Sequence, residues 1–183
     1  HQNVARAVYV DITNDMLNSL PYGMFGGEEG GIWQDVRLVI TNRVHIEDVF
    51  AGVRMDGGNF EVTLQNSSMT NEEVEVKIEL LDKQTSGRLY ISQKPEKTTL
   101  PPGEIRIINC ETGNINPKLW TPEFPNLYTL ITSVYKKDLL IDRDSINIGF
   151  RTFEVKGDKF YLNGNPYWLR GANHPPCGIA PND

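Results

Sequence analysis

Cysteine and histidine are scarce in this chain, which also lacks an excess of positive charge and any long apolar run. Two cysteines among 183 residues are too few for the disulfide framework of a small secreted scaffold, so no bridge between Cys110 and Cys177 is expected. None of the three histidines has a partner at metal-ligand spacing, so no metal is expected. The formal net charge of -6 offers no basic stripe for phosphates, so a nucleic-acid partner is not expected. No run approaches the roughly 20 apolar residues of a membrane span, so no membrane partner is expected.

The sequence also lacks the motifs of several enzyme classes. It contains no G-x-S-x-G elbow, no P-loop and no dinucleotide fingerprint, and the glycine-rich stretch GMFGGEEGG at residues 23–31 follows no βαβ pattern. We therefore expect no cofactor. The compartment stays open, with a periplasmic or secreted location slightly favoured.

Short runs that alternate apolar and polar residues dominate what is present. Residues 59–65 (NFEVTLQ) and 74–80 (VEVKIEL) each place apolar side chains on one face, as half-buried antiparallel strands do. The polar link NSSMTNEE between them predicts a hairpin, and MDGGN before the first run supplies glycine where a positive φ is needed.

Further strand patterns recur between residues 43 and 150, and no amphipathic helix interrupts them. They are residues 105–109 after the Pro-Pro-Gly turn at 101–103, then 127–135, 139–141 and 145–155. Beyond them, residues 160–162 and 167–169 predict a hairpin around the turn NGNP. This spacing predicts an all-β protein, an immunoglobulin-like β-sandwich of about seven strands.

Three segments together resemble glycoside hydrolase family 2, the β-galactosidases, β-glucuronidases and β-mannosidases. They are GGIWQDVRLVI at 30–40, LWTPEFPNLYTL at 119–130 and GFRTFEVKGDKFYLNGNPYWLRGANHPP at 149–176. The resemblance implies a C-terminal remnant of a sugar-binding jelly roll at 1–42, the sandwich at 43–150, and a linker with the first strand of a catalytic (β/α)8 barrel at 151–183. It also implies intramolecular packing of the sandwich on both neighbouring domains.

Several residues of these segments are expected to have structural roles. Trp33 is expected to be a core aromatic residue. Pro122 and Pro125 prevent regular ladder pairing and predict an extended connector, whose role is packing. The Asn-Gly pair at 163–164 is typical of a strand reversal.

The LRGANH stretch at 169–174 carries the functional expectation. By resemblance, Arg170, Asn173 and His174 lie at the C-terminal end of the first barrel strand, where barrel enzymes place their active sites. They would bind substrate in the parent enzyme, because an Arg fork, an Asn amide and a His ring all hydrogen-bond to oxygen-rich ligands. The continuation PPCGIAPND departs from the HED-like sequence typical of β-galactosidases, so the sugar is not specified.

No catalytic residue is expected within the chain. A retaining glycosidase needs two carboxyl groups about 5 to 5.5 Å apart, and the resemblance places both glutamates beyond Asp183. Five glutamates qualify by residue type alone and are expected to be solvated charges in loops or turns, and Asp15 matches a sugar-contacting position only loosely. The five are Glu28, Glu29, Glu72, Glu73 and Glu123.

The leading interpretation is a non-catalytic fragment of a retaining exo-β-glycosidase, inactive alone, whose parent cleaves β-linked oligosaccharides. Two alternatives remain. The first is a free-standing immunoglobulin-like module that binds carbohydrate or protein, since sandwiches host many functions. The second is a small complete enzyme that uses Glu28 or Glu29 with Asp15.

Overall fold

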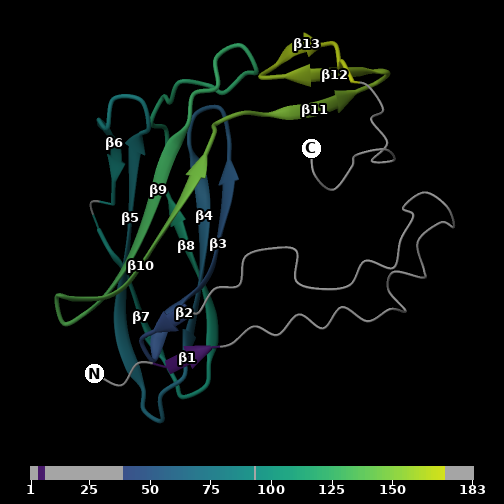
Figure 1. Ribbon diagram of the computed structural model, residues 1–183. Helices are drawn as coiled ribbons and strands as arrows, with labels where there is room; N and C mark the ends of the chain where they lie inside the picture. The colour runs from purple at the N-terminus through teal and green to yellow at the C-terminus, as the bar shows by residue number, and fades with distance from the viewer. Residues whose placement is uncertain (1–3, 7–38, 93, 172–183) are drawn as a thin grey trace, which may run out of the picture. The chain divides into compact units, whose positions relative to one another are not determined.

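The computed structural model describes residues 4–6, 39–92 and 94–171 (Figure 1). The chain divides into two compact units, one of His1–Val4 with Thr41–Trp168 and one of Ala5–Ile40 with Leu169–Asp183. All regular elements within the described ranges are β-strands, which confirms the all-β prediction. The same ranges contain no helix that is long and apolar enough to cross a membrane.

Eight strands build a two-sheet sandwich in the first unit. They are β3 (Val44–Val53), β4 (Gly58–Asn66), β5 (Glu72–Asp82), β6 (Arg88–Ile91), β7 (Glu96–Leu100), β8 (Ile105–Glu111), β9 (Tyr128–Lys136) and β10 (Leu139–Ile148). One sheet has the order β3-β4-β8, and the other has the order β10-β9-β5-β6 with β7 also paired to β5. β6 pairs with residues 79–81 of β5 and β7 with residues 72–76, so the two serve as one interrupted edge strand. Seven strand positions in antiparallel sheets confirm the immunoglobulin-like sandwich.

The predicted hairpin between residues 59–65 and 74–80 is wrong. β4 pairs with β3 and β8, whereas β5 pairs with β6, β7 and β9, so the two strands belong to opposite sheets. The alternating pattern shows only that each strand has one buried face. Two strands that face each other from opposite sheets each have one buried face, just as two hairpin partners do. The short polar link between β4 and β5 crosses from one sheet to the other.

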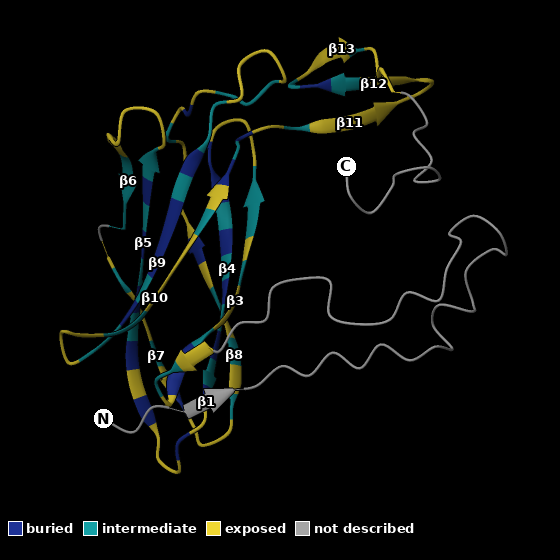
Figure 2. Cartoon of the chain, in the orientation of Figure 1, coloured by how far each residue is buried: buried dark blue, intermediate teal, exposed yellow. Residues whose placement is uncertain are grey.

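The core lies between the two sheets and is made by the inward faces of their central strands. In Figure 2 buried residues gather on β4, β5 and β9. Phe60, Leu64, Ile78 and Leu130 are at most 1% exposed, and each contributes about 1.5 to 3 kcal/mol through burial. The remaining fully buried apolar residues include Val62, Val76, Leu80, Leu100, Val134 and Phe150.

Glycine before β4 serves close packing and not a positive φ, contrary to the sequence prediction. Neither Gly57 nor Gly58 is among the positive-φ residues. A β-carbon on Gly57 would stand 2.0 Å from the carbonyl oxygen of Gly113, so only glycine fits. The Pro-Pro-Gly turn behaves as predicted, with Gly103 at φ +73 and the Glu104 amide donating to the Pro101 oxygen at 3.2 Å.

A small sheet follows the sandwich, made by β11 (Phe153–Lys156), β12 (Lys159–Leu162) and β13 (Asn165–Tyr167) in that order. The predicted hairpin is confirmed as β12 and β13, with Asn163 at φ +52 and Gly164 at φ +77 as a type I′ turn requires. Its second strand is Asn165–Tyr167 and not 167–169 as predicted, because the turn takes only two residues. The predicted run 145–155 is divided, because its first part belongs to β10 and its last part to β11. A separate two-stranded sheet contains β1 (Val4–Arg6) and β2 (Val39–Thr41).

Candidate functional site

Trp120 is the centre of the junction between the sandwich and the small sheet. Its backbone amide donates to the Phe150 carbonyl oxygen at 2.8 Å. The guanidinium of Arg151 lies 4.6 Å from the centre of the indole ring, where the electron-rich face attracts a cation. The motifs LWTPEFPNLYTL and GFR thus meet in space at this side chain.

The connector that carries Trp120 is anchored on the core through Tyr128. The Tyr128 ring packs edge-on against Phe150, with centroids 5.3 Å apart and planes at 76°. Its hydroxyl oxygen accepts the Lys118 backbone amide at 2.9 Å, and burial raises the pKa of this phenol. The Asn126 side chain donates to the Leu119 carbonyl at 2.8 Å. Residues 112–127 contain no strand, and these contacts give them the packing role expected from their prolines.

An open apolar groove of about 350 Å³ adjoins Trp120. β3 contributes Ala51 and Val53, while Leu127, Ile148 and Gly149 complete the apolar lining and Arg151 adds a cation. None of the described residues that line it is a carboxylate. Its lining is suited to receive an apolar side chain.

One face of the small sheet is mostly apolar and partly exposed. The pairing register places Phe153, Val155, Phe160, Leu162, Asn165 and Tyr167 on this face, of which Leu162 is buried. Phe153 stacks on Phe160 at 5.7 Å and meets Tyr167 edge-on at 6.5 Å. Phe153, Val155 and Phe160 are nevertheless 48%, 65% and 38% exposed. A sheet normally buries its apolar face against another layer, so the exposure of these three side chains is unusual for a sheet.

Arg170 is the only predicted substrate residue that the structure describes. It is exposed and follows β13 by three residues. Asn173 and His174 lie outside the described residues, so the structure does not bring the predicted set together. Asp15, Glu28, Glu29 and Trp33 lie outside them as well. Within the described ranges no group of three or more His, Cys, Asp or Glu side chains could hold a metal ion.

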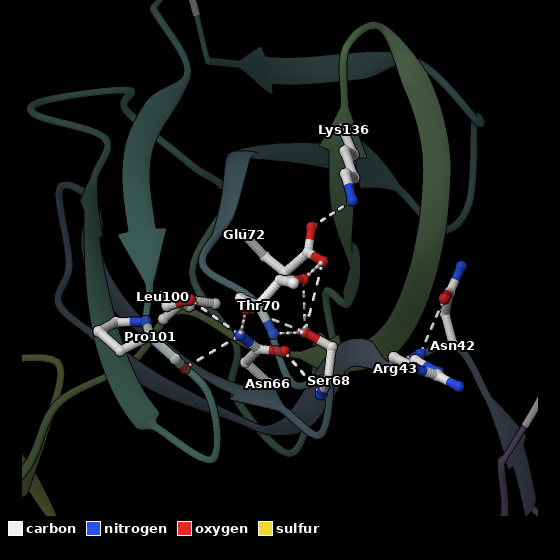
Figure 3. Close-up of polar contacts among 9 residues, drawn as sticks. All are labelled: Asn42, Arg43, Asn66, Ser68, Thr70, Glu72, Leu100, Pro101 and Lys136. Atoms are coloured by element: carbon white, nitrogen blue, oxygen red, sulfur yellow. Dashed lines mark hydrogen bonds and ion pairs between the residues drawn. The ribbon is translucent and has the colours of Figure 1, made fainter.

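Glu72 corrects one of the predictions about the carboxylates. Glu73 and Glu123 are exposed as predicted, but Glu72 is only 9% exposed, at the start of β5. Its carboxylate pairs with Lys136 and accepts hydrogen bonds from Thr70 Oγ1 at 2.9 Å and Ser68 Oγ at 3.3 Å (Figure 3). Burial works to raise the pKa of Glu72, but the hydrogen bonds from Lys136, Thr70 and Ser68 and the Lys136 charge outweigh it, so the pKa lies below its usual value.

Asn66 completes this network, and sequence reasoning missed it. Its side-chain amide is fully buried and donates to three carbonyl oxygens, those of Thr70 at 2.9 Å, Leu100 at 2.8 Å and Pro101 at 3.0 Å. Its oxygen accepts the Ser68 amide at 2.9 Å. These bonds hold the crossing between β4 and β5. In sequence, an asparagine in a polar link looks like any turn residue.

This fold and its junction motifs correspond to a known family. The model of Glycosyl hydrolases family 2 matches residues 44–151, from the first strand of the sandwich to Arg151. The chain belongs to glycosyl hydrolase family 2. The resemblance found in the three sequence motifs is thereby confirmed, and the matched residues are the sandwich itself.

Curated relatives of this family 2 chain are far longer than it is. A β-galactosidase of Priestia megaterium is 32% identical over 151 residues, which are 78% of this chain and 14% of that protein. A β-galactosidase of Alteromonas mediterranea is 30% identical over 162 residues, covering 84% of this chain and 16% of the relative. The family 2 chain therefore spans less than a fifth of the length of these enzymes.

Solved structures give the same picture. A crystal structure of Bacteroides uniformis β-glucuronidase matches with a TM-score of 0.64 at 26% identity, over 78% of this chain and 18% of that one. A family 2 member from Bacteroides cellulosilyticus matches with a TM-score of 0.64 at 25% identity, over 73% of this chain and 19% of its own.

Proposed function

We propose that the chain is a non-catalytic part of a retaining exo-β-glycosidase that removes terminal β-linked sugars from glycans. The observation that supports this most directly is the family 2 match over the sandwich, in a chain that spans 14% and 16% of two β-galactosidases. Its work is to hold neighbouring domains at a fixed spacing. The carboxyl pair required for retention, about 5 to 5.5 Å apart, is supplied beyond Asp183.

The neighbours are a jelly roll, of which residues 1–42 are the C-terminal remnant, and a (β/α)8 barrel, of which residues 151–183 are the linker and first strand. The open face made by Phe153, Val155 and Phe160 supports packing on the barrel, because it is apolar, exposed and directly follows the sandwich. The groove beside Trp120 offers a second apolar contact.

Arg170, Asn173 and His174 contact the substrate in the parent enzyme. Arg170 is exposed and follows β13 by three residues, so its side chain is accessible to a ligand. Its planar fork of donors suits sugar hydroxyls, a sugar carboxylate or a catalytic carboxylate. Residues at the C-terminal ends of barrel strands are those that face the active site.

The first test is hydrolysis. The 183-residue chain and the parent enzyme are purified from the same host and assayed with nitrophenyl β-galactoside and nitrophenyl β-glucuronide. The parent enzyme turns over at least one of them and the chain turns over neither. Activity that co-purifies with the chain through successive columns would contradict the proposal.

The second test separates the roles of individual residues. In the parent enzyme, Arg170→Lys is expected to lower kcat/KM by roughly tenfold or more, because lysine keeps the charge but cannot make the forked, two-donor contact. Arg54→Lys is the matched control, since Arg54 is a half-exposed arginine of the sandwich. Equal kcat/KM for the two variants would remove Arg170 from the site. Saturable calorimetric binding of a β-glycoside by residues 43–150 alone would favour the free-standing binding module.

A further inference from the structure

Asn163 lies where three segments of the chain meet. It belongs to the turn between β12 and β13, yet its hydrogen bonds reach the linker after β10 and the connector before β9. Its backbone amide donates to the Thr152 oxygen at 2.9 Å, and its side-chain oxygen accepts the Thr152 amide at 3.0 Å. Its side-chain nitrogen donates to the Trp120 oxygen at 3.0 Å.

The bond to Trp120 ends on a fixed point of the sandwich. Trp120 is tied to Phe150 by a backbone hydrogen bond and is covered by the Arg151 guanidinium. Phe150 in turn is fully buried in the core. A hydrogen bond to the Trp120 carbonyl therefore links the small sheet to the rigid part of the molecule.

The linker between β10 and β11 comprises only residues 149–152, but it is not rigid by itself. Each of its residues has two soft backbone torsions, so β11 could leave the sandwich in many directions. The hydrogen bonds between Thr152 and Asn163 fasten this linker to the turn between β12 and β13. The hydrogen bond from Asn163 to Trp120 then fixes the orientation of the small sheet on the sandwich.

Asn163 has two roles, which are to adopt the positive φ of the turn and to make the side-chain hydrogen bonds. It has φ +52 in a turn where both central residues need a positive φ. Asparagine and glycine both adopt this conformation readily. Glycine would make the same turn but could not make the side-chain bonds to Thr152 and Trp120.

We propose that Asn163 is a positioning residue that fixes the orientation of the β11–β13 sheet on the sandwich, and with it the direction in which the chain leaves β13. The inference depends only on contacts within this chain. It stands whether or not Arg170 binds sugar, and the test below requires no activity.

The test measures orientation by NMR in the ¹⁵N-labelled, partially aligned 183-residue chain. In the wild type, the amide residual dipolar couplings of β12 and β13 and those of β4, β5 and β9 fit one alignment tensor. In Asn163→Gly the couplings of the small sheet depart from that tensor. The Thr152 amide also exchanges with solvent about tenfold faster or more, because its acceptor is gone.

A second variant isolates the bond to Trp120. Asn163→Asp tolerates the same φ and keeps an oxygen for the Thr152 amide, but it replaces the donor with an oxygen that faces the Trp120 carbonyl. The couplings are expected to depart from the sandwich tensor while Thr152 remains protected. Asn116→Gly is the matched control, because Asn116 has φ +48 and is exposed, and its couplings are expected to match the wild type. A single shared tensor in Asn163→Gly or in Asn163→Asp would overturn the proposal.

Discussion

Gly149 lies so close to Trp120 that a β-carbon on Gly149 would stand 3.0 Å from the Trp120 β-carbon and 3.1 Å from Cγ and Cδ1. Gly149→Ala therefore requires Trp120, which packs against Arg151, to shift. We expect a loss of about 1 to 3 kcal/mol in the free energy of unfolding, as for other overpacked sites, measured by urea denaturation. Gly171→Ala is the control, since among the described residues no atom lies within 4 Å of the added carbon. Equal stabilities of the two variants would contradict this packing.

The network at Glu72 predicts a specific pH dependence. Because the pKa of Glu72 is lowered in the folded chain, its carboxylate contributes stability that is present above the unfolded pKa near 4.3 and is lost as the pH falls through the folded value. Glu72→Gln should thus be less stable than the wild type at neutral pH, by about 1 kcal/mol or less because Lys136 is partly exposed. The difference should shrink towards zero below about pH 3.

Urea unfolding at a series of pH values measures this difference. Glu154→Gln is the control, because Glu154 pairs with Lys156 at 2.9 Å and both side chains are about half exposed. It should change stability little at any pH. If Glu72→Gln kept a constant difference from the wild type down to pH 3, the Glu72 carboxylate would not be its source.

Asn66 should be the most sensitive polar residue of the sandwich. Asn66→Asp removes the donor of three hydrogen bonds, of which the one to Leu100 is fully buried, and sets a carboxylate against three carbonyl oxygens. Leaving buried groups unpaired beside a buried charge costs about 3 kcal/mol or more, which thermal unfolding will detect as a large fall in Tm. Asn71→Ala, at an exposed position of the same link, should leave Tm nearly unchanged. A mild effect of Asn66→Asp would mean that the crossing is held by other contacts.

Cys110 should be inert in the folded chain. It is a free thiol, 4% exposed, and burial followed by the charge of Glu96 raises its pKa to about 11. The thiolate is the reactive form. In the variant Cys177→Ser, whose only cysteine is Cys110, a thiol reagent should therefore react no faster than the protein unfolds, and it should react rapidly in urea. The variant Cys110→Ser, whose only cysteine is Cys177, shows how the reagent reacts with the other thiol. Fast, stoichiometric labelling of native Cys177→Ser would contradict the buried position of Cys110.

Local patterns predict most strands of this protein, because alternation and turn residues act over a few neighbours, but they do not predict β3, β6 or β7. β4, β5 and the hairpin at Asn163–Gly164 all lie where the sequence places them. Pairing is harder to predict, since it depends on which buried faces meet. The link after Asn66 is as short and polar as a hairpin turn, and only the pairing of β4 and β5 with other strands shows that it crosses between the sheets.

The candidate site is predicted unevenly for similar reasons. Motif resemblance identifies the family and points to Arg170, but the contacts that build the junction are not local. Trp120 and Asn163 are 43 positions apart, and no periodicity links them. The environment of Glu72 is equally hard to predict from sequence. An acidic residue at the start of a strand is expected to be solvated, and only the structure shows the contacts with Ser68, Thr70 and Lys136.

The sandwich also has a mechanical character, which follows from how β3 and β10 lie. The Ile46 amide donates to the Asp142 carboxylate at 2.7 Å, and farther along Ala51 and Ile148 line the same groove, so the two strands run in the same direction (Figure 1). The chain thus enters at one end and leaves at the other, roughly 30 Å away for a strand of this length. A pull on the two ends would therefore act along the length of β3 and β10 and not across them.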